Sequence, residues 1–266
     1  MEKRFICRNV LVTGASSGIG RASALRFARE GANVALVARN RERLEAVAEE
    51  VRALGVRGEV YLADTSNAPE IYAAADAALA DFGSLHAVHC NAGIYLRRPA
   101  KDLTTADISR IMDTNFYGTL NTIYAVLPYM LRRGEGSIVT TVSMDGKKGV
   151  PPDAAYVSAK FALNGFLQVL RQELRGTGVH IGAVFPSRTD TPQIAHVACP
   201  AVTPKADPAV VAKAVADCVY YRRREMLVPW LPCKLLVLAD AVSPALGDFL
   251  VRQLHLSGTQ TGDPVV

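Results

Sequence analysis

The sequence contains few cysteines, and none of them is placed for a metal site. Cys7, Cys90, Cys199, Cys218 and Cys233 are odd in number and widely scattered. Cysteines of a disulfide framework or a zinc site come in even numbers or at regular short spacings. We therefore expect no disulfide scaffold, no bound metal and a reducing, cytoplasmic location.

A hydrophobic run long enough to cross a membrane is also missing. The longest stretch without a charged residue, 114–131, is interrupted by two asparagines, a glycine and a proline, which does not suit a membrane span. The first four residues include a glutamate, a lysine and an arginine, and a short apolar strand follows them, so they do not resemble a signal peptide.

Basic residues exceed acidic ones, 30 to 25, but they are not gathered in one stretch. Only Arg222-Arg223-Arg224 forms a run, for which a solvated basic face is the simplest explanation. Aromatic and basic residues do not alternate along the chain, so we expect no nucleic-acid partner. The mild excess of positive charge suits phosphate on a small cofactor, or an anionic membrane surface.

The remaining composition is that of a globular protein, with 50% hydrophobic and 21% charged residues in a chain of 266. Short apolar runs alternate with stretches of helical periodicity, without a linker or an internal repeat. The pattern predicts one α/β domain over residues 1–266. Its core would be a Rossmann-type, doubly wound parallel sheet of about seven strands with helices on both faces. The expected strands are 10–12, 33–38, 59–63, 86–89, 137–143, 179–185 and 226–228.

Two long helices are expected over about 105–132 and 155–175. Asn115 lies near the middle of the first helix. An asparagine inside an apolar helix makes a structural hydrogen bond or bends the helix.

A glycine-rich turn follows the first strand and leads into a helical pattern. A strand, a glycine turn and a helix start together present backbone N–H groups and the positive end of the helix to a phosphate. Glycine lets the backbone approach the anion closely. The spacing differs from the common Gly-x-Gly-x-x-Gly fingerprint, and tight turns need glycine too. In this setting we predict a cofactor phosphate site made by Gly14, Ser16, Ser17, Gly18, Ile19 and Gly20.

The second strand ends at Ala38, where dinucleotide folds that bind NAD carry an acidic residue for the ribose 2′-hydroxyl. No carboxylate stands there, and Arg39 instead offers a cation to the 2′-phosphate of NADP. The alternative is a solvent-exposed arginine at a helix start, which is what we expect of Arg41 and Arg43. We therefore predict NADP(H) in preference to NAD(H).

The next two strands end in further candidate cofactor contacts. Asp64 follows the third strand and either accepts a hydrogen bond from the adenine amino group or caps the following helix. Asn91-Ala92-Gly93 follow the fourth strand, and such small residues let a flat ring or a sugar pack close to the backbone.

The residue types for proton transfer come together around Tyr156. On a helix, Tyr156 and Lys160 share one face because they are four residues apart. A neighbouring ammonium favours the phenolate and lowers the pKa of a tyrosine, which is ordinarily about 10. The fifth strand delivers Ser143, whose hydroxyl can hydrogen-bond a reacting oxygen. A tyrosine and a lysine at this spacing are common by chance, so the pair gains meaning only from the rest of the chain.

Together these motifs, over residues 8–192, resemble the short-chain dehydrogenase/reductase family. The resemblance lies in their order and spacing. The matching residues are the turn 13–20, Arg39, Asn91-Ala92-Gly93, Asn115, Ser143, Tyr156 and Lys160.

The resemblance implies a role for each member of a catalytic tetrad. Tyr156 would donate a proton in reduction or accept one in oxidation. Lys160 would bind the nicotinamide ribose and lower the pKa of the tyrosine. Ser143 would hold the substrate oxygen, and Asn115 would position a water molecule that links Lys160 to solvent.

Two positions depart from the family pattern. Cys90 replaces an asparagine before Asn91, a small substitution that the site should tolerate. Ser187 replaces the glycine that usually follows Pro186, and a positive φ there would cost more for serine. Thr189 and Thr191 would still be placed to meet the nicotinamide carboxamide.

The C-terminal part supports more than one interpretation. Residues 186–205 correspond to the substrate loop of the family, with His196 expected to line the pocket. Residues 229–254 form an apolar extension that Pro244 interrupts. The extension packs on the domain or a partner subunit, or it lies at a membrane surface with Arg222-Arg223-Arg224 facing anionic lipid.

The sequence therefore predicts an NADP(H)-dependent oxidoreductase that interconverts a carbonyl and a secondary alcohol. The resemblance implies a homodimer or homotetramer paired through the two long helices. The rival interpretation is a catalytically silent NADP(H)-binding regulator with the same fold, for which both Tyr156 and Lys160 would be unnecessary.

Overall fold

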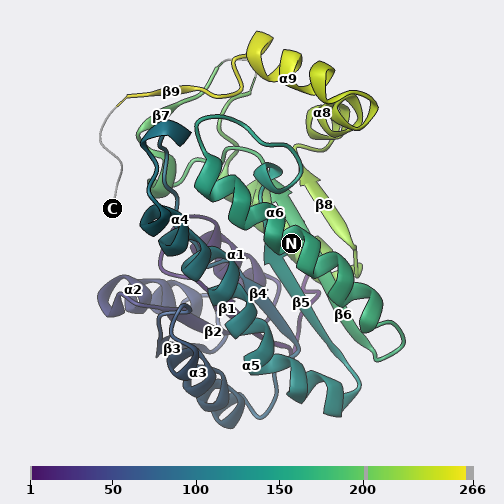
Figure 1. The fold of residues 1–266 in the computed structure, drawn as a ribbon. Helices are drawn as coiled ribbons and strands as arrows, with labels where there is room; N and C mark the ends of the chain where they lie inside the picture. The colour runs from purple at the N-terminus through teal and green to yellow at the C-terminus, as the bar shows by residue number, and fades with distance from the viewer. Residues whose placement is uncertain (1, 201–202, 262–266) are drawn as a thin grey trace.

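The structure, a computed structural model, describes residues 2–200 and 203–261 (Figure 1). Within these residues, seven parallel strands form one sheet in the order β3-β2-β1-β4-β5-β6-β8, so the predicted doubly wound architecture is confirmed. The strand order reverses between β1 and β4, the place where such sheets bind ligands. The strands are β1 (Asn9–Thr13), β2 (Asn33–Ala38), β3 (Gly58–Leu62), β4 (Ala87–Cys90), β5 (Gly136–Thr141), β6 (Val179–Pro186) and β8 (Glu225–Val228).

Helices cover both faces of this sheet. On one face, α1, α2 and α7 enclose an apolar core that includes Phe27 and Val215. On the other, α3, α5 and α6 bury Ile71, Ile123 and Leu163 against the strands. The helices are α1 (Gly18–Arg29), α2 (Arg41–Arg52), α3 (Ala68–Phe82), α4 (Thr105–Met112), α5 (Gly118–Arg133), α6 (Ala154–Glu173), α7 (Pro208–Tyr220), α8 (Trp230–Val242) and α9 (Pro244–Gln253).

The helix predicted over 105–132 is not regular. It consists of α4 and α5 joined by a π-helical turn, Asp113–Tyr117, that contains Asn115. The side chain of Asn115 hydrogen-bonds the main chain of Ile94, with its Oδ1 2.7 Å from the amide nitrogen. A widened turn of this kind is frequent at functional sites, and the prediction that Asn115 makes a structural hydrogen bond is confirmed.

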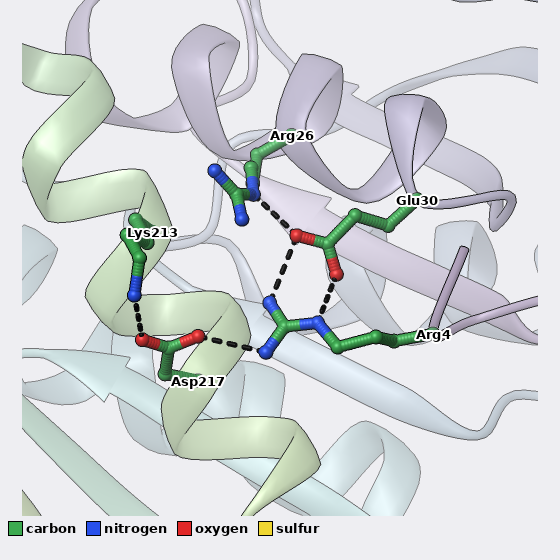
Figure 2. A network of polar contacts seen from close by, with 5 residues as sticks. All are labelled: Arg4, Arg26, Glu30, Lys213 and Asp217. Carbon is green, nitrogen blue, oxygen red and sulfur yellow. Dashed lines mark hydrogen bonds and ion pairs between the residues drawn. The ribbon is translucent and has the colours of Figure 1, made fainter. Parts of the chain in front are cut away.

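The N-terminal segment is fastened to the helical layer by buried ion pairs (Figure 2). Arg4 forms a bidentate pair with Glu30 at the end of α1, with N–O distances of 2.6 and 2.8 Å. Its remaining Nη1 bonds Asp217 of α7 at 2.8 Å. Arg26 also bonds Glu30, and Lys213 bonds Asp217. These partners raise the pKa of Arg4, although its burial opposes them. The network ties three separate parts of the chain together.

The C-terminal extension folds back as the helix pair α8–α9 above the carboxyl ends of the strands (Figure 1). Pro244 begins α9, so its predicted interruption of the helix is confirmed. Lys148, in the loop after β5, holds the pair by ion pairs to Asp240 and Asp248, each 2.7 Å long. The extension thus packs on its own domain.

The basic run Arg222-Arg223-Arg224 and the C-terminal extension, which were considered for contact with a membrane surface, are separated by β8. Arg222-Arg223-Arg224 precede β8 and Trp230 follows it, so the basic run and the extension lie at opposite ends of that strand. In the part of the chain that the structure describes, no helix combines the length and apolarity needed to span a bilayer.

Candidate active site

One large cavity opens at the carboxyl ends of the strands, with a volume of about 1000 Å³. It extends from the glycine turn past Tyr156 to the helix pair α8–α9. All the residues predicted for catalysis or cofactor binding line it except Gly20 and Asn115, which lie against the lining residues Gly14 and Gly93. The predicted residues on the wall are Gly14, Ser16, Ser17, Gly18, Ile19, Arg39, Asp64, Asn91, Ala92, Gly93, Ser143, Tyr156, Lys160, Pro186, Thr189 and Thr191.

The glycine turn has the geometry of an anion cradle. Gly18 adopts a φ of 52°, which side chains disfavour, and begins α1. A Cβ atom on Gly20 would lie 2.1 Å from the carbonyl oxygen of Gly14, so only glycine fits there. Ser17, at the N-cap, makes no side-chain capping bond, which leaves the first N–H groups of the helix available. These residues fit the phosphates of a dinucleotide.

A charged pair lies where the adenosine end of such a cofactor would sit. Arg39 follows β2 and its side chain is 70% exposed, with Nη1 3.3 Å from Asp64 Oδ2. Asp64 Oδ1 accepts from the amide and hydroxyl of Ser66, while Asn67 is the N-cap of α3, so Asp64 is not the helix cap. Burial raises the pKa of Asp64, but the bonds from Ser66 and the charge of Arg39 outweigh it, and the pKa lies below its ordinary value. Arg43, predicted to be an ordinary solvent residue, also reaches this wall.

The segment Asn91-Ala92-Gly93 lines the cavity next to the glycine turn. The backbone N–H groups of Asn91 and Ala92 donate to Thr13 Oγ1 at 3.0 and 3.2 Å. A Cβ on Gly93 would lie 2.9 Å from Asn115 Oδ1, so glycine is needed for this approach.

The residues predicted to react come from α6 and from the loop after β5. Lys160 is only 4% exposed, donates to the carbonyl of Thr141 at 3.2 Å, and lies 5.4 Å from the centre of the Tyr156 ring. Ser143 lies two residues beyond β5, which ends earlier than predicted. Its φ of 154° and ψ of 159° are rare for a residue with a side chain and are found mainly at functional sites.

The pKa values around Tyr156 differ from what the family resemblance implies. Burial raises the pKa of the Tyr156 phenol, and the Asp145 carboxylate raises it further, while a hydrogen bond with Ser143 lowers it. Burial also lowers the pKa of Lys160 to about 8, against the opposing charge of Asp145. The expectation that Lys160 brings the pKa of Tyr156 below its usual value does not hold in this structure, because burial dominates.

The loop after β6 corrects two further expectations. Ser187 donates its amide to the carbonyl of Val228 at 2.7 Å and does not adopt a positive φ, so replacing glycine there causes no backbone strain. His196 is buried and lies outside the residues that line the cavity, while its neighbour Ile194 lines it. Thr189 is buried and donates to the carbonyl of Ser187 at 3.1 Å.

Several residues that line the cavity were not predicted from the sequence, because no motif marks them. Tyr95 packs edge-on against Tyr156, with ring centres 5.1 Å apart. Asp145 and Asp153 bring two carboxylates beside the phenol. Their proximity in sequence to Gly93, Ser143 and Tyr156 was the only hint available. The helix pair α8–α9 adds an apolar wall of Pro232, Cys233, Leu235, Leu236, Leu250 and Leu254.

Comparisons with known proteins agree with this geometry. A family model described as short chain dehydrogenase matches residues 8–198. An uncharacterized oxidoreductase of Myxococcus xanthus is 39% identical over 67% of this chain and 71% of its own. A 3-oxoacyl-(acyl-carrier-protein) reductase of Staphylococcus aureus is 37% identical over 67% of this chain and 73% of its own. An alcohol dehydrogenase of the archaeon Thermococcus sibiricus, solved with 5-hydroxy-NADP, superposes with a TM-score of 0.76. It is 27% identical, and the match covers 83% of this chain and 95% of that one.

Proposed function

Because the chain belongs to the short-chain dehydrogenase family, we propose that it transfers a hydride between NADP(H) and a carbonyl or secondary alcohol. The observation that carries the proposal is the meeting of Tyr156, Ser143 and Lys160 on the wall of one cavity that begins at the glycine turn. The cofactor supplies or takes up the hydride when bound. Tyr156 supplies the proton to the reduced carbonyl, or removes it from the alcohol.

The other residues of the site hold the reactants for this proton transfer. Ser143 hydrogen-bonds the substrate oxygen beside the phenol. Lys160, fixed by its bond to Thr141, offers its ammonium to the nicotinamide ribose and to Tyr156. Asn115 holds the loop at Ile94 in place. Thr189 and Thr191 meet the carboxamide of the nicotinamide. Such positioning lowers the barrier by fixing the reacting atoms together.

The cofactor we propose is NADP(H) rather than NAD(H). Arg39 stands at the end of β2 with its guanidinium exposed to the cavity, where a 2′-phosphate would accept bidentate bonds. The alcohol dehydrogenase that resembles this chain in fold was solved with an NADP derivative, which supports the assignment.

The substrate we propose has an apolar body. The wall that α8–α9 adds consists of leucines, a proline and a cysteine, and it lies beyond Tyr156 from the glycine turn. Such a wall favours ketones with a lipophilic group over small polar ones. The reductase relative acts, by its name, on 3-oxoacyl groups, so an acetoacetyl thioester is a sensible probe.

We further propose a cytoplasmic homodimer or homotetramer in which a second copy covers the outer face of α5 and α6. This face exposes Tyr117, Tyr124, Phe161 and Val169, with Val169 53% exposed. A monomer in sedimentation velocity would contradict the pairing. For the exposed residues of α8, among them Trp230, the alternative occupants are a partner subunit and a membrane surface, and flotation with anionic vesicles separates the two.

The experiment that tests the function is NADPH oxidation by the purified protein with acetophenone, butyrophenone and acetoacetyl-coenzyme A. We expect at least one of these carbonyls to be reduced to its alcohol in step with NADPH loss. A protein that binds NADPH tightly but oxidises none of it would support the silent regulator instead.

A further inference from the structure

The carboxylate of Asp145, a residue outside the family motifs, is hydrogen-bonded to Ser143. Asp145 lies in the short helical turn Met144–Gly146 after β5, and its side chain lines the cavity beside Tyr156. The Ser143 hydroxyl donates to Asp145 Oδ2 at 3.1 Å, and the Asp145 amide donates to Ser143 Oγ, also at 3.1 Å. The hydroxyl that would meet the substrate oxygen is therefore already engaged on both sides.

This engagement limits what Ser143 can offer a ligand. A serine hydroxyl has one proton, and an ionised carboxylate can only accept hydrogen bonds. While Asp145 is ionised, the proton of Ser143 points to it, and only a lone pair of Oγ remains for the ligand. A lone pair suits an alcohol, which can donate a proton, better than a carbonyl, which cannot. A protonated Asp145 can instead donate to Oγ, which frees the proton of Ser143 for a carbonyl oxygen.

We propose that Asp145 is a positioning residue that sets the direction of the Ser143 hydroxyl, so that its protonated form favours carbonyl ligands and its ionised form favours alcohols. The proposal rests on the function proposed above, because it assigns Ser143 to the substrate oxygen. It adds a selection between the two sides of the reaction that depends on one side chain.

The charges around Asp145 allow both forms near neutral pH. Burial and the neighbouring carboxylate of Asp153 raise the pKa of Asp145 to about 7, while Ser143, Arg188 and Lys160 lower it. Asp153 and Lys160 belong to the start and the body of α6, and Arg188 belongs to the loop after β6.

Two other titrating groups face the same space, but neither is bonded to the carboxylate. Tyr156 hydrogen-bonds Ser143 and not the carboxylate, and burial and Asp145 raise the pKa of its phenol above the ordinary value, so the phenol keeps its proton in this pH range. The pKa of Lys160 is about 8, yet its ammonium bonds the carbonyl of Thr141 and not Ser143. Loss of its proton would change the affinity for both kinds of ligand without exchanging their order.

The test measures ligand binding without turnover. Acetophenone is titrated into the protein with NADP⁺, and α-methylbenzyl alcohol into the protein with NADPH, so no hydride can be transferred in either complex. From one pH unit below the pKa of Asp145 to one unit above it, we expect the Kd of the ketone to rise about fivefold, the worth of one hydrogen bond. The Kd of the alcohol should fall over the same range.

A matched pair of variants assigns the effect to Asp145. Asp145→Asn keeps a donor against Ser143 at every pH, so ketone binding should stay tight relative to alcohol binding, and the ratio of the two Kd values should not depend on pH in this range. Asp76→Asn makes the same chemical change on the exposed face of α3 and should behave as the wild type does. NADPH fluorescence checks that both variants are folded.

A ratio of the two Kd values that is constant with pH in the wild type would overturn the proposal, whether or not Asp145→Asn folds. So would an unchanged pH response in Asp145→Asn. If carbonyls are reduced but the ratio is constant, only this inference fails. If no carbonyl is bound or reduced, the proposed function fails with it.

Discussion

Arg39 carries the choice of cofactor at the scale of single residues. We expect Arg39→Ala to weaken NADPH binding by about ten- to a hundredfold, because a hydrogen-bonded contact to a charged group is worth about 1.5–3 kcal/mol. NADH, which has no 2′-phosphate, should lose less than about twofold. Fluorescence titration with each cofactor measures both effects.

Arg41 provides the control for this prediction. It begins α2, is exposed and does not line the cavity, so Arg41→Ala removes the same charge from the same neighbourhood without touching the site. Equal losses of NADPH and NADH in Arg39→Ala would show that Arg39 does not contact the 2′-phosphate.

The site residues that could be predicted from the sequence are marked by patterns among residues close together in the chain. The glycine turn is recognisable because strand, glycines and helix start follow one another directly, and Tyr156 and Lys160 are paired by helical spacing. Tyr95 could not be found in this way, since its contact with Tyr156 depends on how the loop after β4 packs against α6. Asp145 is only two residues from Ser143, but no motif marks an aspartate at that position. Assignments of individual roles within the cavity stay predictions.

At the scale of elements, Lys148 holds the helix pair α8–α9, which we call the lid of the cavity. Its ammonium pairs with Asp240 of α8 and Asp248 of α9. We expect Lys148→Met to raise KM for butyrophenone about fivefold and to speed proteolysis within α8–α9. The free energy of unfolding should fall by only about 1 kcal/mol, because the partly exposed carboxylates can be solvated instead.

Lys234 on the exposed side of α8 gives the matched control, since Lys234→Met removes an ammonium from the same helix pair. Identical KM values and cleavage rates in the two variants would mean that Lys148 does not keep the lid in place.

Element boundaries show where sequence patterns lose precision. All seven sheet strands lie within two residues of the limits that the sequence predicted, because their apolar runs are bounded by turns. The prediction of one regular helix over 105–132 was wrong in one respect. The hydrogen bonds of Asn115 to Ile94 favour a π-helical turn, which the hydrophobic periodicity of the sequence does not show. The lid was visible only as an apolar extension, because its placement depends on Lys148, far away in sequence.

At the scale of the whole molecule, the network around Glu30 should govern global stability (Figure 2). Glu30 is fully buried and holds Arg4, which in turn holds Asp217 of α7. Glu30→Gln leaves the buried guanidinium without its bidentate partner, which should cost about 3–5 kcal/mol in the free energy of unfolding. Urea unfolding measures the loss.

An exposed ion pair of the same type is the comparison. Arg21 and Glu50 are 46% and 40% exposed, so Glu50→Gln should cost less than about 1 kcal/mol. Similar losses in both variants would show that burial does not strengthen the Glu30 network.

The central claim is that Tyr156 transfers the proton in an NADP(H)-dependent carbonyl reaction, and Tyr156→Phe tests it most directly. The variant keeps the ring that packs against Tyr95 and loses only the hydroxyl. NADPH affinity and acetophenone turnover are to be measured on the same preparation beside the wild type. We predict an unchanged affinity and a kcat lower by about 10²–10⁴-fold, the usual contribution of a positioned acid or base. Near-normal turnover with intact NADPH binding would contradict the role of Tyr156 and, with it, the proposed mechanism.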